Sequence, residues 1–155
     1  MPDKKDDKPN SLDRVRGDRS LARRSGFMAR RVWELAQKAR ELKLADEIEV
    51  VFPDEDLEVA VRKKLEKPEG PLTRGDVKRL EVLDASEAEI GNLSGIEHAI
   101  NLTTLLLAGN QISDVSPLAS LTNLTTLGLG GNPLSQESID VHVPNLRDRG
   151  VTVTL

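Results

Sequence analysis

The chain contains 155 residues, of which 31% are charged, and it carries a formal net charge of −4 at pH 7. It has no cysteine, which excludes a disulfide scaffold, a cysteine-ligated zinc site and a thiol nucleophile. No apolar run approaches the roughly 20 residues that a membrane-spanning helix needs, and the first residues lack the apolar core of a signal peptide. The sequence by itself therefore favours the cytoplasm.

The first fifty residues divide into a polar tail and a helix. Residues 1–20 have almost no apolar side chain and cannot bury enough surface to offset the entropy of ordering, so we expect a disordered tail. Within residues 21–50, apolar residues recur at steps of three and four, which predicts a basic amphipathic helix over residues 25–44, with Ser25 as its N-cap, followed by a linker. The apolar stripe consists of Met28, Val32, Leu35, Ala39 and Leu42.

The surface of this helix allows two interpretations. Arg and Lys crowd its other faces from Arg23 to Lys43, so residues 23–43 could bind an anionic membrane surface, a nucleic acid or a partner's groove. Alternatively, the stripe packs on the neighbouring cap or on a second copy, as a homodimer through helix 25–44. We favour packing, because residues 1–50 have a net charge of +3 and residues 51–155 one of −7. The expected helix contacts are Met28, Val32, Leu35, Leu42 and, beside the stripe, Trp33.

Residues 51–79 have the features of a helical N-terminal cap. Asp54 is the candidate N-cap of an amphipathic helix whose apolar residues share one face. Thr73 and Asp76 have the spacing of a capping box with Asp in place of the usual Glu, which predicts a second short helix. The shared face of the first helix consists of Leu57, Ala60, Val61 and Leu65.

A pattern with a period of 22 residues occupies residues 80–134. It follows the leucine-rich repeat form L-x-x-L-x-L-x-x-N-x-L, in which each unit adds one short strand to a parallel sheet. In the first unit Ala85 and Ala88 replace a leucine and the asparagine, while Asn110 and Asn132 are expected to bond backbone groups at the turns. The repeated positions are Leu80, Leu83 and Ile90; Leu102, Leu105, Leu107, Asn110 and Ile112; and Leu124, Leu127, Leu129, Asn132 and Leu134.

Residues 135–155 are expected to cap the other end of the array. Residues 145–150 predict a polar turn or short helix, and residues 151–155 alternate in a way typical of a terminal strand. An open outer edge there would promote aggregation, so the strand is either short and exposed or covered. The residues expected to continue the packing are Ser138, Ile139, Val143 and Pro144.

The sequence contains little that indicates an enzyme. His98 and His142 lie on different units and have no metal-ligand spacing, and no pair of carboxylates falls in a predicted pocket. The run Gly128–Asn132 lacks the lysine and the following helix of a phosphate-binding loop. We therefore predict no catalytic residue, no metal, no cofactor and no small-molecule substrate.

From Phe52 to Leu155 the sequence resembles bacterial leucine-rich repeat domains of the internalin type. The matching features are Phe52-Pro53-Asp54 with its helix, the return segment 112–118, and the closing segment 132–135. The resemblance implies a short curved solenoid with a parallel sheet on the concave side and 3₁₀ or irregular segments on the convex side. Together with the helical N-terminal cap and the separate N-terminal helix predicted above, this gives an α/β fold. It also implies protein binding without catalysis, at the cell surface or after secretion.

The family resemblance places the protein-binding surface on the concave face, at the third, fifth and seventh positions of each unit. Apart from Leu106 these side chains are small or weakly polar, and none is the Trp, Tyr or Arg that usually dominates an interface. Either a partner is recognised elsewhere, or the short array binds little by itself; Glu87 and Glu89 could add an acidic rim. The candidate positions are Val82, Asp84, Ser86, Thr104, Leu106, Ala108, Thr126, Gly128 and Gly130.

The leading hypothesis is a non-catalytic protein–protein interaction module built on the solenoid. The alternative is an adaptor whose basic helix, residues 23–43, binds an anionic membrane surface or a nucleic acid. The partner expected under the leading hypothesis is another protein, which the sequence does not identify.

Overall fold

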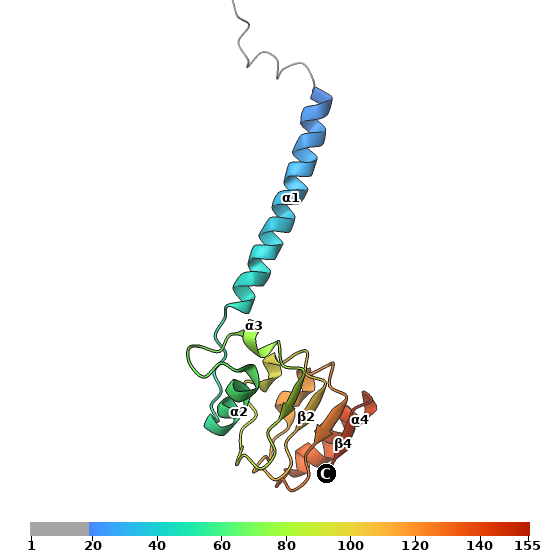
Figure 1. Cartoon of the computed structure of the whole chain (residues 1–155). Coiled ribbons are helices and arrows are strands. Elements are labelled where there is room, and N and C mark those ends of the chain that lie inside the picture. Colours follow the sequence, from blue (N-terminus) through green and yellow to red (C-terminus); the bar gives the residue numbers. More distant parts are fainter. Residues whose placement is uncertain (1–18) are drawn as a thin grey trace, which may run out of the picture. The chain divides into compact units, whose positions relative to one another are not determined.

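A computed structural model describes residues 19–155, which fall into two compact units, one ending at Lys43 and the other spanning Leu44–Leu155. Figure 1 labels several of their helices and strands. The tail predicted at residues 1–20 lies outside the described residues, apart from its last two. Within residues 19–155, no helix has the length and apolar character needed to cross a membrane.

Helix α1 (Arg19–Asp46) is one continuous α-helix. It begins at Arg19, so the prediction that Ser25 is the N-cap is wrong. The residues immediately before Ser25 are mainly Leu, Ala and Arg, which favour helix and extend α1 toward the N-terminus. The predicted apolar stripe therefore lies within a longer helix than expected.

The second unit begins before the boundary predicted at residue 50. Glu49 forms an antiparallel bridge with Thr73. Val50 donates its backbone N–H to the carbonyl of Leu72 at 2.7 Å, and its side chain is buried. The segment predicted as a linker is therefore part of the N-terminal cap.

Helix α2 (Glu55–Leu65) covers the end of the repeat core. As predicted, Asp54 is its N-cap: the carboxylate accepts the backbone N–H of Leu57 at 3.0 Å. Leu57 and Val61 point inward and are fully buried. The exposed face of α2 remains free to form one wall of the site described below.

Helix α3 (Arg74–Val77) is a single turn between α2 and the first strand. The predicted capping box is present, because the Thr73 hydroxyl accepts from the backbone N–H of Asp76 and the Asp76 carboxylate accepts from that of Thr73. This short helix places Val77 in the core.

The four strands form one parallel sheet in the order β1-β2-β3-β4. Leu83 pairs with Leu105, Leu105 with Leu127, and Leu127 with Val153, so the 22-residue spacing becomes lateral stacking as predicted. The inward-facing leucines of the three repeats are almost completely buried, except for Leu134 at the end of the last repeat, which is half-buried. The strands are β1 (Val82–Asp84), β2 (Thr104–Leu106), β3 (Thr126–Gly128) and β4 (Thr152–Thr154).

The return segments of the repeats contain 3₁₀-helices η2 (Ile96–His98) and η3 (Ser116–Ser120). Their apolar residues Ile96 and Leu118 are fully buried. The result is the predicted fold class: a short leucine-rich repeat solenoid with a parallel sheet on one side and 3₁₀ segments on the other (Figure 1).

The array ends in a π-helical segment, η4 (Ser138–His142), followed by α4 (Val143–Asp148). Ser138 and Val143 are buried as predicted, but Ile139 is 41% exposed and Pro144 is also exposed. In a π-helix, residues five apart share a face, so Ser138 and Val143 turn inward and the residue after each turns outward. The prediction that Ile139 and Pro144 continue the packing is wrong.

Strand β4 is the last strand of the sheet and is only three residues long. The Arg147 guanidinium, on α4, donates to the backbone carbonyl of Val153 at 3.2 Å. A short strand with a covered carbonyl offers little backbone for pairing with another chain. Both of the alternatives predicted for this edge, a short strand and a covering group, are therefore present.

Candidate protein-binding surface

The nine residues predicted for the concave face occupy one side of the sheet. They alternate with buried residues along and just beyond β1, β2 and β3, so none points into the core. Val82 is 42% exposed, whereas Leu106 is half-buried because it leans on the neighbouring strand. A Cβ placed on Gly128 would lie 3.4 Å from Leu106 Cδ2. The centre of the face is therefore nearly flat.

As predicted, the side chains of Asn110 and Asn132 bond backbone groups in the turns that follow the strands. We call these two stacked residues the asparagine ladder. Asn110 Oδ1 accepts the backbone N–H groups of Ala88 and Ile90, each at 3.0 Å, and its Nδ2 donates to the carbonyls of Ala85 and Leu107. One unit later, Asn132 Oδ1 accepts the backbone N–H of Ile112, and its Nδ2 donates to the carbonyls of Leu107 and Leu129. These bonds fix where each strand ends, and so fix the rim of the concave face.

A groove with a volume of about 640 Å³ lies beside this face, between α2 and β1. The outward residues of β1 form one wall, and the exposed side of α2 forms the other. Val59 on α2 is 63% exposed and, with Val82, provides apolar surface. The remaining lining residues are Asp56, Ala60, Lys63, Lys64, Glu66, Asp84, Ala85, Ser86 and Ala88.

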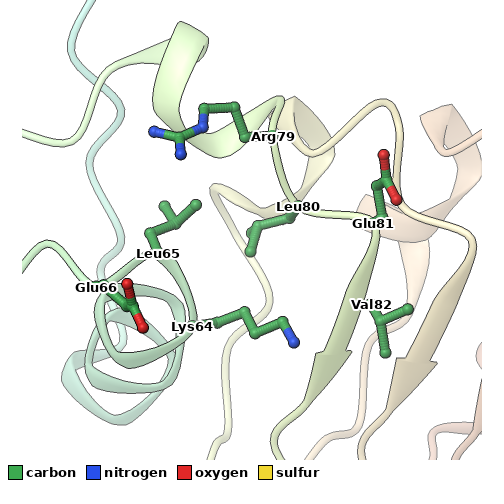
Figure 2. A pocket seen from close by; sticks show the side chains of 7 residues that line it. All are labelled: Lys64, Leu65, Glu66, Arg79, Leu80, Glu81 and Val82. Carbon is green, nitrogen blue, oxygen red and sulfur yellow. The ribbon is translucent and has the colours of Figure 1, made fainter.

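A second hollow of about 330 Å³ continues past Val82 at the start of β1. Figure 2 shows Leu65 and Leu80 facing each other there, with Arg79 beside them and the Lys64 side chain extending toward β1. Lys64, Glu66 and Val82 line both hollows, so the two are adjacent. Charged side chains of both signs border the two hollows.

Asp84 provides a fixed negative charge at this surface. Its carboxylate accepts the Ser86 hydroxyl at 2.8 Å and the Ser86 backbone N–H at 3.1 Å. These two hydrogen bonds from Ser86 lower the pKa of Asp84 below its ordinary value of 3.8. Asp84 therefore stays ionised near neutral pH and is held in one orientation.

The predicted helix contacts belong to the first unit and are described by themselves. Val32, Trp33, Leu35 and Leu42 lie on α1 and are all at least 60% exposed, while the side chain of Met28 lies outside the described residues. Within residues 19–155, no three His, Cys, Asp or Glu side chains cluster as a metal site would require. His98 ends η2 and His142 ends η4, on separate elements.

Sequence reasoning missed the contribution of α2 to the site. Val59 and Lys63 are four residues apart and so lie on the same side of α2, away from the buried pair Leu57 and Val61. An apolar residue on the polar side of the cap helix was the available signal. The distance between the exposed side of α2 and strand β1, however, depends on how the helix packs on the sheet, and local spacing does not predict that packing.

A family model for leucine-rich repeats in two copies matches residues 100–142. Among solved structures, internalin C2 from Listeria monocytogenes is 32% identical with a TM-score of 0.58, the match covering 66% of this chain and 45% of that one. Internalin InlF from the same species is 30% identical with a TM-score of 0.57, covering 66% and 29%. InlJ, whose functional domain includes a cysteine ladder, is 27% identical with a TM-score of 0.56, covering 66% and 22%.

The comparison with curated protein sequences gives no significant match. The chain spans less than half the length of each of the three internalins. The stacked strands, the asparagine ladder and the matched repeats together define a leucine-rich repeat domain. Its similarity to the Listeria proteins makes it, more specifically, a bacterial internalin-like leucine-rich repeat domain.

Proposed function

We propose that the domain is a non-catalytic protein-binding module that holds its partner in the groove between α2 and β1. The observation that carries this proposal is the exposed pair Val59 and Val82, which face one hollow from two different elements. Internalin-like repeat domains generally bind proteins and are typically not enzymes. The groove specifies where on this short array a partner would gain the most contact.

The charges around the groove indicate the chemistry of the partner. Lys63 and Lys64 lie on the α2 side between the acidic residues Asp56 and Glu66, and Asp84 lines the β1 side. A protein segment that inserts an apolar side chain between the valines could therefore place a carboxylate near the lysines and a cation near Asp84. Such pairs at the rim of an interface contribute orientation and association rate more than affinity.

The experiment selects peptides that bind the full chain from a random library and maps them by NMR. We expect the shifted amide signals to concentrate on α2 and β1, and a Val59→Asp, Val82→Arg double variant to lose at least tenfold in affinity. Both valines are largely exposed, so neither substitution removes core packing. Circular dichroism verifies that the variant remains folded.

Val51→Arg provides the matched control, since Val51 is 72% exposed and does not line the groove. This variant should bind the peptides as the unmodified chain does. Binding that survives the double variant, or amide shifts that map to the 3₁₀ segments, would contradict the proposal. Loss of binding in the control would show that charge alone, and not the groove, was responsible.

A further inference from the structure

Helix α1 carries a narrow apolar stripe, separate in sequence from the residues that line the binding groove. Val32, Leu35, Ala39 and Leu42 follow one another at steps of three and four residues. Val32, Leu35 and Leu42 are between 60% and 64% exposed, and Ala39 is exposed as well. This spacing matches the core positions of a coiled coil, in which the stripe of one helix packs against that of another.

The other apolar residues of α1 do not widen this stripe into a face for a membrane. At about 100° per residue, Trp33 lies roughly 100° from Val32 and nearly opposite Leu42. Leu44 lies on the same side as Trp33. A helix that lies in a lipid interface needs its large apolar residues together on one broad face. The arrangement on α1 therefore favours a helix as the occupant.

The charges beside the stripe decide which helix fits. Arg31 and Lys38 border it on one side and Lys43 on the other, whereas the acidic residues Glu34 and Glu41 point away from it. In a parallel pair of copies, Lys38 would face Lys43 of the second copy. In an antiparallel pair, the Arg31 and Lys38 sides would face each other. A second copy would therefore bring like charges together, and these oppose pairing.

From this stripe and its cationic borders, we propose that α1 binds a helix of another protein that carries an apolar heptad stripe with acidic residues on both sides. Apolar contacts along Val32, Leu35, Ala39 and Leu42 would supply affinity. Pairs between the partner's carboxylates and Arg31, Lys38 and Lys43 would select that partner over basic helices.

The test uses the full chain and two synthetic coiled-coil peptides that share Val and Leu core positions. One peptide carries Glu, and the other Lys, at every position beside the core. We expect the Glu peptide to bind, with affinity falling about tenfold or more from low to high salt, and the Lys peptide not to bind. A Leu35→Asp, Leu42→Asp variant should abolish binding, and Trp33→Asp, which lies off the stripe, should leave it unchanged.

Three results would overturn the proposal. The first is that neither peptide binds, or that the Glu peptide binds the Leu35→Asp, Leu42→Asp variant equally well. The second is that the chain alone sediments as a dimer that this variant disperses, which would make a second copy the occupant. The third is stripe-dependent binding to vesicles of phosphatidylserine and phosphatidylcholine. All these variants leave α2 and β1 unchanged. A negative result in this experiment would therefore contradict the proposal for α1 and would not contradict the proposal for the groove.

Discussion

The Asp54 carboxylate accepts the backbone N–H of Gly91 at 2.8 Å, although the two residues are 37 positions apart in the sequence. The same oxygen accepts the N–H of Asn92 at 2.9 Å, while the other oxygen caps α2 at Leu57. One side chain thus joins the start of the cap helix to the return segment of the first repeat. It thereby helps to fix α2 beside β1, and with it the width of the groove.

We expect Asp54→Ala to destabilise the domain by about 2 kcal/mol, because the substitution removes an N-cap and leaves two further N–H groups without their acceptor. Asp54→Asn should cost less, since its single oxygen can still cap α2 but cannot also serve Gly91 and Asn92. Urea unfolding followed by circular dichroism measures both values. Equal stability of the alanine variant and the unmodified chain would contradict the bridging role of Asp54.

Two carboxylates should make stability fall in acid. Partial burial raises the pKa of Asp54, but hydrogen bonds from the backbone N–H groups of Gly91, Asn92 and Leu57 outweigh it and hold the pKa below 3.8. Burial likewise raises the pKa of Asp76, and bonds from Lys67 and Thr73 lower it further than burial raises it. Both groups bind protons more weakly in the folded state than in the unfolded state.

Such groups stabilise the fold fully above their unfolded pKa, and this contribution is lost as the pH falls through the folded pKa. We expect the free energy of unfolding to decline below about pH 5 and the curve to flatten in a variant carrying Asp54→Asn and Asp76→Asn. Urea titrations between neutral and acidic pH measure the slope. If the variant and the unmodified chain kept parallel curves, other carboxylates would be responsible.

Asn110 should contribute more stability than Asn132, although both occupy the same position of the repeat. Asn110 is buried and accepts two backbone N–H groups, whereas Asn132 is half-buried and accepts only that of Ile112. We expect Asn110→Ala to cost roughly 3 kcal/mol and Asn132→Ala about half as much, because buried donors would lose their acceptor. Thermal or urea unfolding ranks the two variants, and the reverse order would contradict this account.

Glu87 occupies a backbone conformation that favours glycine. Its φ is 54°, and the equivalent residues of the next two repeats are Gly109 and Gly131, with φ of 69° and 72°. We expect Glu87→Gly to stabilise the domain by about 0.5–1 kcal/mol, because relief of the left-handed strain exceeds the entropy that glycine loses. Denaturant midpoints measure the gain.

Gly109→Ala is the converse of this substitution. A Cβ on Gly109 would lie 3.0 Å from Glu87 Cγ and would also be strained at positive φ. The variant should lose about 1–2 kcal/mol in the same urea assay. Opposite signs for the two substitutions would support the conformational argument, whereas a loss in both would refute it.

The repeat core was predictable because its determinant is periodic. Leucines 22 residues apart can stack only if their strands are in register, and Leu83, Leu105 and Leu127 do so. The capping box of Thr73 and Asp76 was equally accessible, since both partners lie within one helical turn. The repeat spacing was therefore sufficient to predict the strand register, and spacing within one helical turn was sufficient to predict this capping box.

The groove and the details of the caps were not predictable in this way. The bond between Asp54 and Gly91 joins distant segments, and the outward turn of Ile139 and Pro144 depends on a π-helical segment that the sequence pattern does not mark. Whether Val59 reaches the concave side depends on how α2 packs on β1. These features arise from tertiary packing, which the periodicity of the sequence does not predict.

The equal offset between β1, β2 and β3 makes the middle of the domain modular. Strand β4 follows β3 after 26 residues instead of 22, because η4 and α4 replace the ordinary return segment (Thr126 pairs with Thr152). Duplicating residues 102–123 should therefore insert one complete rung while both ends keep their own partners. Lengthening the array in this way would enlarge its concave face and leave the N-terminal and C-terminal caps unchanged.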